Sequence, residues 1–389
     1  MTIKKKFQTY MCCFYIFASI FLVLSSCSKA KNNVLWSIFP FENGRFAISY
    51  NSSFTSVNHK DGQILSDSGS CQTCHKQVYK NWYNSRHRVS FSNKLYKEAH
   101  SREPMQWCLN CHAPLLSQKQ ERVQAEDGIS CIVCHVRDKK VLVPALPEKK
   151  QGTYTHTYKV VPEFKQAEFC ANCHQFNFPT ASSGMHTNPI IFTDVSMQNT
   201  FKEWQSSSYY KKSNCQTCHL KPYSQESHTF PGGHHREKVS AAIQLYAERV
   251  NDYAVSIQVT SLGIGHNFPT GDLFRTLRII FRSQDSLVEE LILRRTFENI
   301  EEDLLTKDSP NKQMVLDTTI PAPNFGDYAA KRTFVITVPA SIRELRYEMY
   351  MDYLNGVNHM LSTVPLVKTR PLVRKGRLKI HVTGESNKG

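Results

Sequence analysis

Long apolar segments are scarce in this chain of 389 residues. The one that stands out, residues 11–24, has 14 residues, whereas a helix that crosses a bilayer needs about 20. It follows Lys4, Lys5 and Lys6. A basic segment followed by a short apolar one is typical of a signal peptide and not of a membrane-spanning helix. The pattern therefore predicts that residues 1–26 direct export.

The apolar segment leads into Leu24-Ser25-Ser26-Cys27, which is similar to a bacterial lipobox. In such a sequence the cysteine becomes the lipidated first residue of the mature protein. An uncleaved anchor, or ordinary cleavage nearby, is the alternative. We expect a lipoprotein, anchored to a membrane through lipid on Cys27, on the periplasmic or cell-surface side, with residues 27–69 as a tether.

Unpaired cysteines are absent beyond Cys27. The chain has 13 cysteines; Cys12 and Cys13 lie in the signal segment, and the remaining ten form five C-x-x-C pairs, each followed at once by a histidine. The five motifs are Cys71/Cys74/His75, Cys108/Cys111/His112, Cys131/Cys134/His135, Cys170/Cys173/His174 and Cys215/Cys218/His219. Ten cysteines in an exported chain ordinarily suggest five disulfides, but disulfides do not require a histidine after each pair.

The combination C-x-x-C-H is the attachment signal of c-type haem. The two thiols add to the vinyl groups of the porphyrin, and the adjacent histidine coordinates the iron. A zinc ribbon is a weaker interpretation, because it needs paired cysteines but no histidine at a fixed position. We therefore expect five haem c groups, and with them iron, bound by the ten cysteines and the five adjacent histidines.

Nucleic-acid-binding motifs are also absent, although the net charge is +15 and the pI about 9.2. Without residues 1–26, which hold three lysines and no acidic residue, the charge is +12. Five haems would add roughly ten propionate charges, partly offset by the iron. The basic balance therefore offsets the cofactors, and we expect no nucleic-acid partner.

Eleven further histidines are available as the sixth iron ligand. Iron with two strong axial ligands suits electron transfer, whereas catalysis needs an open or weakly held position. The expected distal ligands are His87, His100, His186, His228, His234 and His266. As a ligand, His266 in the "GHNFPTG" segment would fix the C-terminal domain to the haem region; the alternative is a turn residue. His359 and His381 are expected at the surface, and His59 and His156 are left undecided.

The fold expected for residues 70–235 is a mostly α, haem-packed cytochrome c domain. This region has about 33 residues per haem, which leaves room only for short helices. Cysteine is absent from 236–389, where 236–250 looks like a linker helix. Strand candidates then follow at 253–260, 275–283, 287–295, 332–338, 346–354 and 377–384. Six or more strands predict an all-β, sandwich-like C-terminal domain.

The segment "CQTCHKQVYKNWYNSRH" resembles the opening of the multihaem cytochrome c-554/c-prime family and of the wider hydroxylamine-oxidoreductase-like cytochromes. "CLNCHAPL", "GISCIVCH" and "EWQSSSYYKKSNCQTCHL" are similar to later haem segments of these proteins. "HTFPGGHH" and "GHNFPTG" are similar to segments of larger members that carry a β-domain. The resemblance covers residues 70–235. It implies parallel and perpendicular haem pairs, with His87 as a distal ligand to a neighbouring haem.

Two main functions follow from these features. The first is an electron carrier that connects a membrane donor to an extracytoplasmic redox partner, such as a quinol-linked donor or a terminal reductase. The alternative is an oxidoreductase acting on a small nitrogen or sulfur compound at one five-coordinate haem. The segment 203–209 is similar to 81–87 but has Tyr209 where the first copy has His87. This difference leaves the enzyme hypothesis open. A third possibility is a binding module, in which the β-domain recruits the partner.

Overall fold

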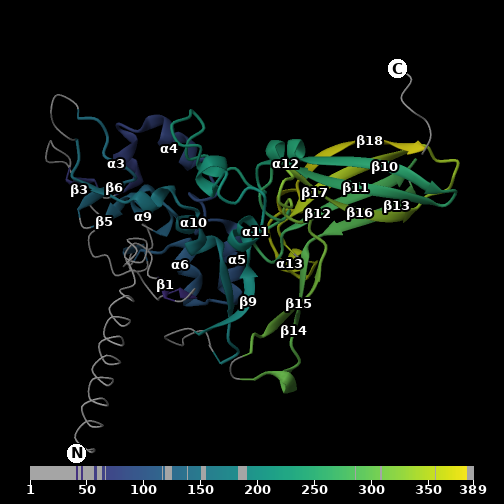
Figure 1. The fold of residues 1–389 in the computed structure, drawn as a ribbon. Coiled ribbons are helices and arrows are strands. Elements are labelled where there is room, and N and C mark those ends of the chain that lie inside the picture. Colours follow the sequence, from purple (N-terminus) through teal and green to yellow (C-terminus); the bar gives the residue numbers. More distant parts are fainter. Residues whose placement is uncertain are drawn as a thin grey trace, which may run out of the picture.

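The computed structural model describes most of the chain from residue 67 onward (Figure 1). The described residues are 41–42, 45–46, 57–58, 64–65, 67–115, 117–118, 125–137, 139–149, 155–182, 191–284, 286–306, 309–354 and 356–382. The expected signal peptide, Cys27, His59 and His186 lie outside them. None of the helices in these ranges has the length and apolar character needed to cross a membrane.

The first region is built from short helices, as the sequence predicts, and most of them carry a cysteine motif. They are α3 (Ser68–Gln72), α4 (Lys76–Tyr83), α5 (Lys94–Arg102), α6 (Leu109–His112), α9 (Cys131–His135), α10 (Ala167–His174), α11 (Thr200–Gln205), the 3-10 helices η1 (Gln106–Cys108) and η2 (Pro162–Lys165), and the π-helix η3 (Gln216–Leu220). Short strands join them. These are β1 (Phe41–Glu42), β2 (Arg45–Phe46), β3 (Val57–Asn58), β4 (Ile64–Leu65), β5 (Val136–Arg137), β6 (Lys140–Val143), β7 (Tyr158–Val160), β8 (Phe176–Pro179) and β9 (Phe192–Gln198).

Aliphatic packing in the helical region is sparse. Among the described residues its buried apolar side chains form two small clusters. These are Leu115, Ile132, Val133 and Val136 in one, and Leu142 with Val161 in the other. A domain of this length normally has one continuous core. Most of the interior of this region must therefore be stabilised by something other than aliphatic contacts.

The second region is one curved sheet of seven strands (Figure 1). In spatial order the strands are β13 (Ser286–Leu293), β12 (Thr276–Ser283), β17 (Glu344–Asp352), β18 (Leu372–Val382), β10 (Ile243–Asn251), β11 (Ala254–Leu262) and β16 (Ala329–Thr337). Each of the six expected strand segments corresponds to one of them. The β10–β18 pair is parallel, and the other neighbours are antiparallel. The two edge strands, β13 and β16, also approach each other.

The expected sandwich of separate sheets is therefore wrong in detail, because the parallel β10–β18 pair joins both halves into one sheet that curls toward a half-barrel. Inward-facing side chains from every strand form a single apolar core, which includes Ile257, Ile279, Phe281 and Ile380. A hairpin of β14 (Arg295–Asn299) and β15 (Lys312–Asp317) extends from the sheet (Figure 1), and η4 (Glu302–Leu304) lies between its strands.

The expected linker helix at 236–250 is half right. Residues Arg236–Ala242 form α12, but the chain then continues as strand β10. Ile243 and Ala247 are spaced four residues apart, which fits a helix as well as a strand. Both side chains are fully buried in the sheet core, and pairing with β11 and β18 decides the outcome.

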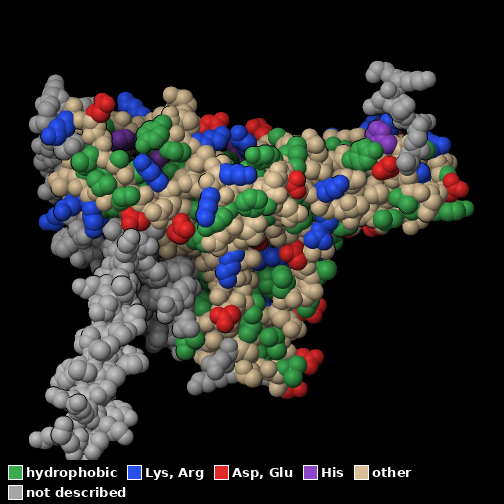
Figure 2. Space-filling model, in the orientation of Figure 1, with side chains coloured by type: hydrophobic (Ala, Val, Ile, Leu, Met, Phe, Trp, Pro, Cys, Tyr) green, Lys and Arg blue, Asp and Glu red, His purple; other side chains and the backbone are tan. Residues whose placement is uncertain are grey.

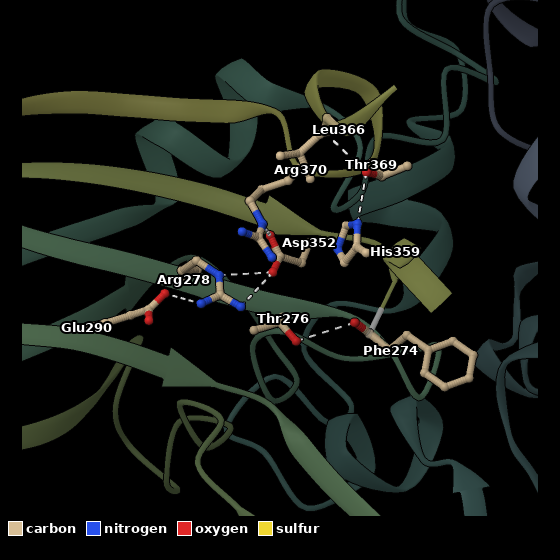
Figure 3. A network of polar contacts seen from close by, with 9 residues as sticks. All are labelled: Phe274, Thr276, Arg278, Glu290, Asp352, His359, Leu366, Thr369 and Arg370. Carbon is tan, nitrogen blue, oxygen red and sulfur yellow. Dashed lines mark hydrogen bonds and ion pairs between the residues drawn. The ribbon is translucent and has the colours of Figure 1, made fainter. Parts of the chain in front are cut away.

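A buried carboxylate holds the end of the sheet that faces the helical region (Figure 3). Asp352, which is 2% exposed, accepts hydrogen bonds from Arg278 at 3.0 Å and from Arg370 at 2.8 Å. Arg278 also bonds Glu290 across the β12–β13 pair. The short helices α13 (Gly356–Leu361) and α14 (Leu366–Thr369) follow Asp352. The network therefore ties both helices to the strands.

The loop before β12 is bonded directly to the helical region. Thr270 donates to the buried carboxylate of Glu203 at 2.6 Å. Arg295 donates to the carbonyls of Met197 at 3.1 Å and of Gly271 at 2.8 Å. These contacts place the "GHNFPTG" loop against α11 and β9 of the helical region. Figure 2 shows basic side chains spread over both regions on the face drawn, interspersed with acidic and apolar ones.

Candidate haem-binding site

Each C-x-x-C-H motif forms about one helical turn, which brings its two thiols and its imidazole together. In the first motif the N–H groups of Cys74 and His75 both donate to the carbonyl of Cys71, at 3.3 and 3.0 Å. The third motif is α9 itself, and the fourth is the end of α10. All ten motif cysteines are free thiols. The five motifs are therefore folded in the way that two thioether bonds and one axial ligand require.

The ten motif cysteines differ in exposure. Cys74 lies in the turn between α3 and α4 and is exposed, as is His75 beside it. Cys218 is exposed too. The other eight are partly buried, namely Cys71, Cys108, Cys111, Cys131, Cys134, Cys170, Cys173 and Cys215.

Three of the motif imidazoles face a second imidazole from a distant segment. The ring centroids are 6.2 Å apart for His174 and His87, 6.1 Å for His135 and His228, and 6.2 Å for His219 and His266. A metal–imidazole bond is about 2 Å long, and the ring centroid lies roughly 1 Å beyond the nitrogen, so two axial imidazoles on one metal have centroids about 6 Å apart. Each pair therefore has the separation of two ligands on opposite sides of one iron.

The Nδ1 atoms of these pairs are held by the protein. The carbonyl of Leu142 lies 3.0 Å from Nδ1 of His135, and that of Pro231 lies 2.6 Å from Nδ1 of His219. On the opposing side, Nδ1 of His266 lies 2.8 Å from the carbonyl of Asn267. A carbonyl can only accept, so these rings carry their proton on Nδ1, which leaves the Nε2 lone pair available to a metal.

The neutral form of the paired imidazoles is favoured. Desolvation lowers the pKa of His87 to about 3 and the pKa of His228 to about 4. The pKa of His174 is also lowered to about 4, although one side of this ring remains open to solvent. Desolvation likewise lowers the pKa of His219 and of His266. Because only neutral histidine binds a metal, the surroundings suit ligation at neutral pH.

The second motif has different surroundings. Nδ1 of His112 lies 2.7 Å from the carbonyl of Ser90, as in the other motifs. The ring of Tyr96, however, stacks on the imidazole with centroids 3.9 Å apart. One turn along α5, Nε2 of His100 is buried and has no hydrogen-bond partner among the described residues. The same is true of the Tyr96 hydroxyl. Nε2 of His100 and the Tyr96 hydroxyl are therefore both available to bind a metal ion or a polar group held at this motif.

The thiols of the second motif also lie beside Tyr96. Burial first, and then the nearby thiols of Cys108 and Cys111, raise the pKa of the Tyr96 hydroxyl. An aromatic ring shares the space beside these thiols, because α5 packs Tyr96 onto His112. A porphyrin bound at Cys108 and Cys111 would therefore pack against Tyr96.

The remaining expected ligands are not paired in this way. His75 is exposed, and no imidazole of the described chain stacks against it or faces it. His234 stacks on Tyr353 with centroids 3.8 Å apart. His156 packs edge-on against Tyr158.

The two histidines expected at the surface differ. His381 is exposed and stacks on Tyr246 with centroids 5.0 Å apart, which confirms the expectation. His359 is instead partly buried, and its Nδ1 lies 3.1 Å from the hydroxyl of Thr369 in the network of Figure 3. The short α13–α14 segment folds it under the sheet edge.

The repeated Trp–Ser pattern is a structural repeat as well as a sequence one. Trp82 donates its indole N–H to a backbone carbonyl at 2.8 Å, and Trp204 does the same. Both tryptophans are buried. Tyr209, which takes the position of His87, instead bonds the carbonyl of Tyr328 at 3.3 Å. It therefore contacts the β region and does not oppose a motif imidazole.

Sequence reasoning missed the backbone carbonyls that orient the rings, since any residue type supplies one. It also missed Arg275 and Tyr96, which lie beside the motifs. Aromatic and basic residues are common in the chain, so their types alone carry no signal. Only their proximity in the fold identifies them.

Comparisons with known proteins agree with this geometry. Residues 70–136, which include the first three motifs, match the model of the family described as cytochrome c554 and c-prime. Among solved structures, the crystal structure of a penta-heme cytochrome c552 from Thermochromatium tepidum is similar, with a TM-score of 0.61 and 17% identity. The match covers 81% of this chain and 98% of that chain. No curated protein matches the chain.

At 17% identity the structural likeness establishes the fold alone. The family match adds the haem-attachment motifs of residues 70–136. Taken together, these findings support a multihaem c-type cytochrome, with haem and iron as its cofactor.

Proposed function

We propose that this chain binds five haem c groups and carries electrons between a membrane donor and an extracytoplasmic redox partner. The observation that carries the proposal is the set of three opposed imidazole pairs, each with ring centroids 6.1 to 6.2 Å apart. Two strong axial ligands minimise rearrangement on reduction, which favours electron transfer over catalysis. The similar structure is that of a penta-heme cytochrome, which supports the haem count.

The geometry supports the following roles for the residues. The ten motif cysteines, the exposed Cys74 and the partly buried Cys111 among them, would bind the porphyrins covalently, and the five motif histidines would be the proximal ligands. His87, His228 and His266 would be distal ligands for the fourth, third and fifth motifs, and His100 would serve the second. When bound, the haems supply reversible one-electron chemistry at iron.

Contacts between motif cysteines support a continuous row of sites. Cys71 and Cys131, from the first and third motifs, lie close enough that each shifts the pKa of the other. The same holds for Cys170 and Cys215, from the fourth and fifth motifs. Between these pairs, the third and fourth motifs adjoin, since Cys173 contributes to raising the pKa of the buried Cys134 thiol. The first, third, fourth and fifth sites thus adjoin in that order, as a carrier requires.

The location is part of the same proposal. The signal segment, the lipid on Cys27 and the tether would hold the haem region near a membrane, outside the cytoplasm. This position suits exchange with a quinol-linked donor or a terminal reductase.

The test is to produce the full chain in a cytochrome-maturing host and to measure its mass and its magnetic and optical spectra. We expect a mass increase of five haems and mainly low-spin ferric signals. A product without the added haem mass would refute the proposal. Reduction by a quinol-linked donor, followed by reoxidation by a second protein, would identify the partners.

A second candidate, an oxidoreductase for a small nitrogen or sulfur compound, is favoured by one observation. The imidazole of His75 is exposed and faces no second imidazole in the described residues. An iron held there without a sixth ligand would be open to a small molecule. Binding of nitrite, hydroxylamine or CO to one high-spin haem of the wild type, with turnover, would establish the enzyme; the absence of both would leave the carrier.

A further inference from the structure

Two arginines and a histidine from distant segments meet where the helical region adjoins the sheet. Arg86 lies just after α4, His234 lies in the loop before α12, and Arg275 immediately precedes β12. Nη2 of Arg275 is 3.5 Å from Nε2 of His234. The His234 ring stacks on Tyr353 at an interplanar angle of 27°. The Tyr353 hydroxyl donates to a backbone carbonyl at 3.0 Å, which fixes the stack.

Two glycines make room for the Arg275 guanidinium. A Cβ on Gly233 would lie 3.3 Å from Cδ and 3.4 Å from Nη1 of Arg275. A Cβ on Gly271, whose φ is +95°, would also lie 3.4 Å from Nη1. A side chain at Gly233 would press on Arg275, and a side chain at Gly271 would strain the backbone. Gly233 and Gly271 therefore both let the chain pass close to this arginine.

The positive charges of this cluster have no counter-charge in the described part of the chain. Neither Arg86 nor Arg275 has a carboxylate within ion-pair distance there, and the buried Nε of Arg275 lacks a hydrogen-bond partner. By contrast, Arg278, three residues further on, shares Asp352 and Glu290. Arg86 is exposed, but Arg275 is partly buried, and a guanidinium without a partner is costly away from water. The planar donors of the two arginines suit a carboxylate or another oxyanion.

The cluster lies beside the fourth motif. Arg86 is the immediate neighbour of His87, the ring that faces His174. Arg275 contributes to lowering the pKa of His174, after desolvation and His219. Desolvation, and then repulsion from Arg275, lower the pKa of Arg86, although this residue is exposed overall. The two arginines thus reach the same site from opposite regions of the molecule.

We propose that Arg86 and Arg275, positioned by His234 and Tyr353, form a carboxylate-binding site that holds the propionate groups of the haem between His87 and His174. This proposal rests on the proposed function, since it takes the haem at the fourth motif as given. The site would join the two regions, because Arg86 belongs to the helical region and Arg275 to the sheet. It would also raise the reduction potential of that haem, since positive charge near the iron favours the ferrous state.

The test is a redox titration of the full-length holoprotein, followed optically, for wild type and Arg275→Gln. We expect one haem of the five to shift to lower potential, by about a tenfold change in its reduction equilibrium, which is about 59 mV for one electron. Arg275→Lys, which keeps the charge, should shift it less, and adding Arg86→Gln should shift the same haem further. The matched control is Arg343→Gln, an exposed residue before β17, which should shift none. Unchanged potentials in the Arg86→Gln/Arg275→Gln protein would overturn the proposal.

A second measurement separates a propionate from a free oxyanion. Wild type and Arg275→Gln are titrated with nitrite, sulfate and acetate while the spectra and potentials are recorded. We expect no saturable response in either protein. A saturable response in wild type that Arg275→Gln lacks would overturn the propionate assignment and indicate a site for a soluble anion. Loss of the five-haem mass in wild type itself would refute the proposed function, whereas unchanged potentials in a five-haem variant refute only this inference.

Discussion

Replacing His266 by alanine should open the sixth coordination position of one haem. The His266 ring lies 6.2 Å from the ring of His219 and is nearly parallel to it, at 15°. Alanine keeps only the Cβ, so nothing in the variant reaches a metal placed between the two rings. With five haems and His266 as a ligand, as proposed above, one site would lose a strong ligand; we therefore expect a high-spin ferric signal from about one fifth of the haem, and about one equivalent of CO bound per chain after reduction.

The assay is an optical and electron-paramagnetic-resonance spectrum of the purified holoprotein, with a CO titration. Added imidazole should restore the low-spin spectrum, which distinguishes a vacated ligand position from general misfolding. The matched control is His381→Ala, because His381 is exposed and stacks on Tyr246 at the far end of the sheet. The reasoning fails if His266→Ala gains no CO-binding haem, or if His381→Ala gains one as well.

Three further predictions concern stability of the holoprotein, measured by denaturant unfolding. Asp352→Ala should cost about 3 kcal/mol, because it leaves two arginines without their buried partner; a loss below about 1 kcal/mol would contradict the network. Phe281→Ala, at a fully buried core position, should lower the free energy of unfolding by about 3–5 kcal/mol. A decrease as small as that of a surface substitution would refute the single core. Burial raises the pKa of Glu203, so its stabilising contribution is complete below the unfolded pKa of about 4.3 and is lost as the pH rises through the higher folded value. Glu203→Gln should therefore gain stability relative to wild type as the pH rises from about 4; an unchanged difference would count against it.

The attachment motifs were readable from the sequence because their chemistry is local. Two thiols and an imidazole within five residues are sufficient to identify the ligand set, whatever the fold around them. Their surroundings were not readable, since the exposure of Cys74 and the ring of Tyr96 beside Cys111 depend on how neighbouring helices pack. The distal residues were only partly readable. His228 and His266 were among the candidates, but which motif each one faces depends on how the loops return, and no local pattern encodes that.

The strands of the second region were predictable from their alternation, because one face of each is buried against the core. The order in which the strands pair in the sheet was not predictable. Alternation reports burial on one face but carries no information about the neighbouring strand. The segment that links the two halves, β10, was also interpreted as helix, because Ile243 and Ala247 fit both periods. Without β10, the remaining strands suggest two sheets, which is how the sandwich expectation arose.

The position of β18 has a consequence for the order of assembly. Residues Leu372–Val382 are the last strand described, yet they lie at the middle of the sheet, between β17 and β10. Before these residues are synthesised, the other six strands form two separate groups, β13-β12-β17 and β10-β11-β16. A chain that is synthesised from its N-terminus therefore presents all five attachment motifs, which end at His219, more than 150 residues before the β-domain can close. Haem can thus be attached before the sheet is complete. The completed sheet then positions His266 and Arg275 against the helical region.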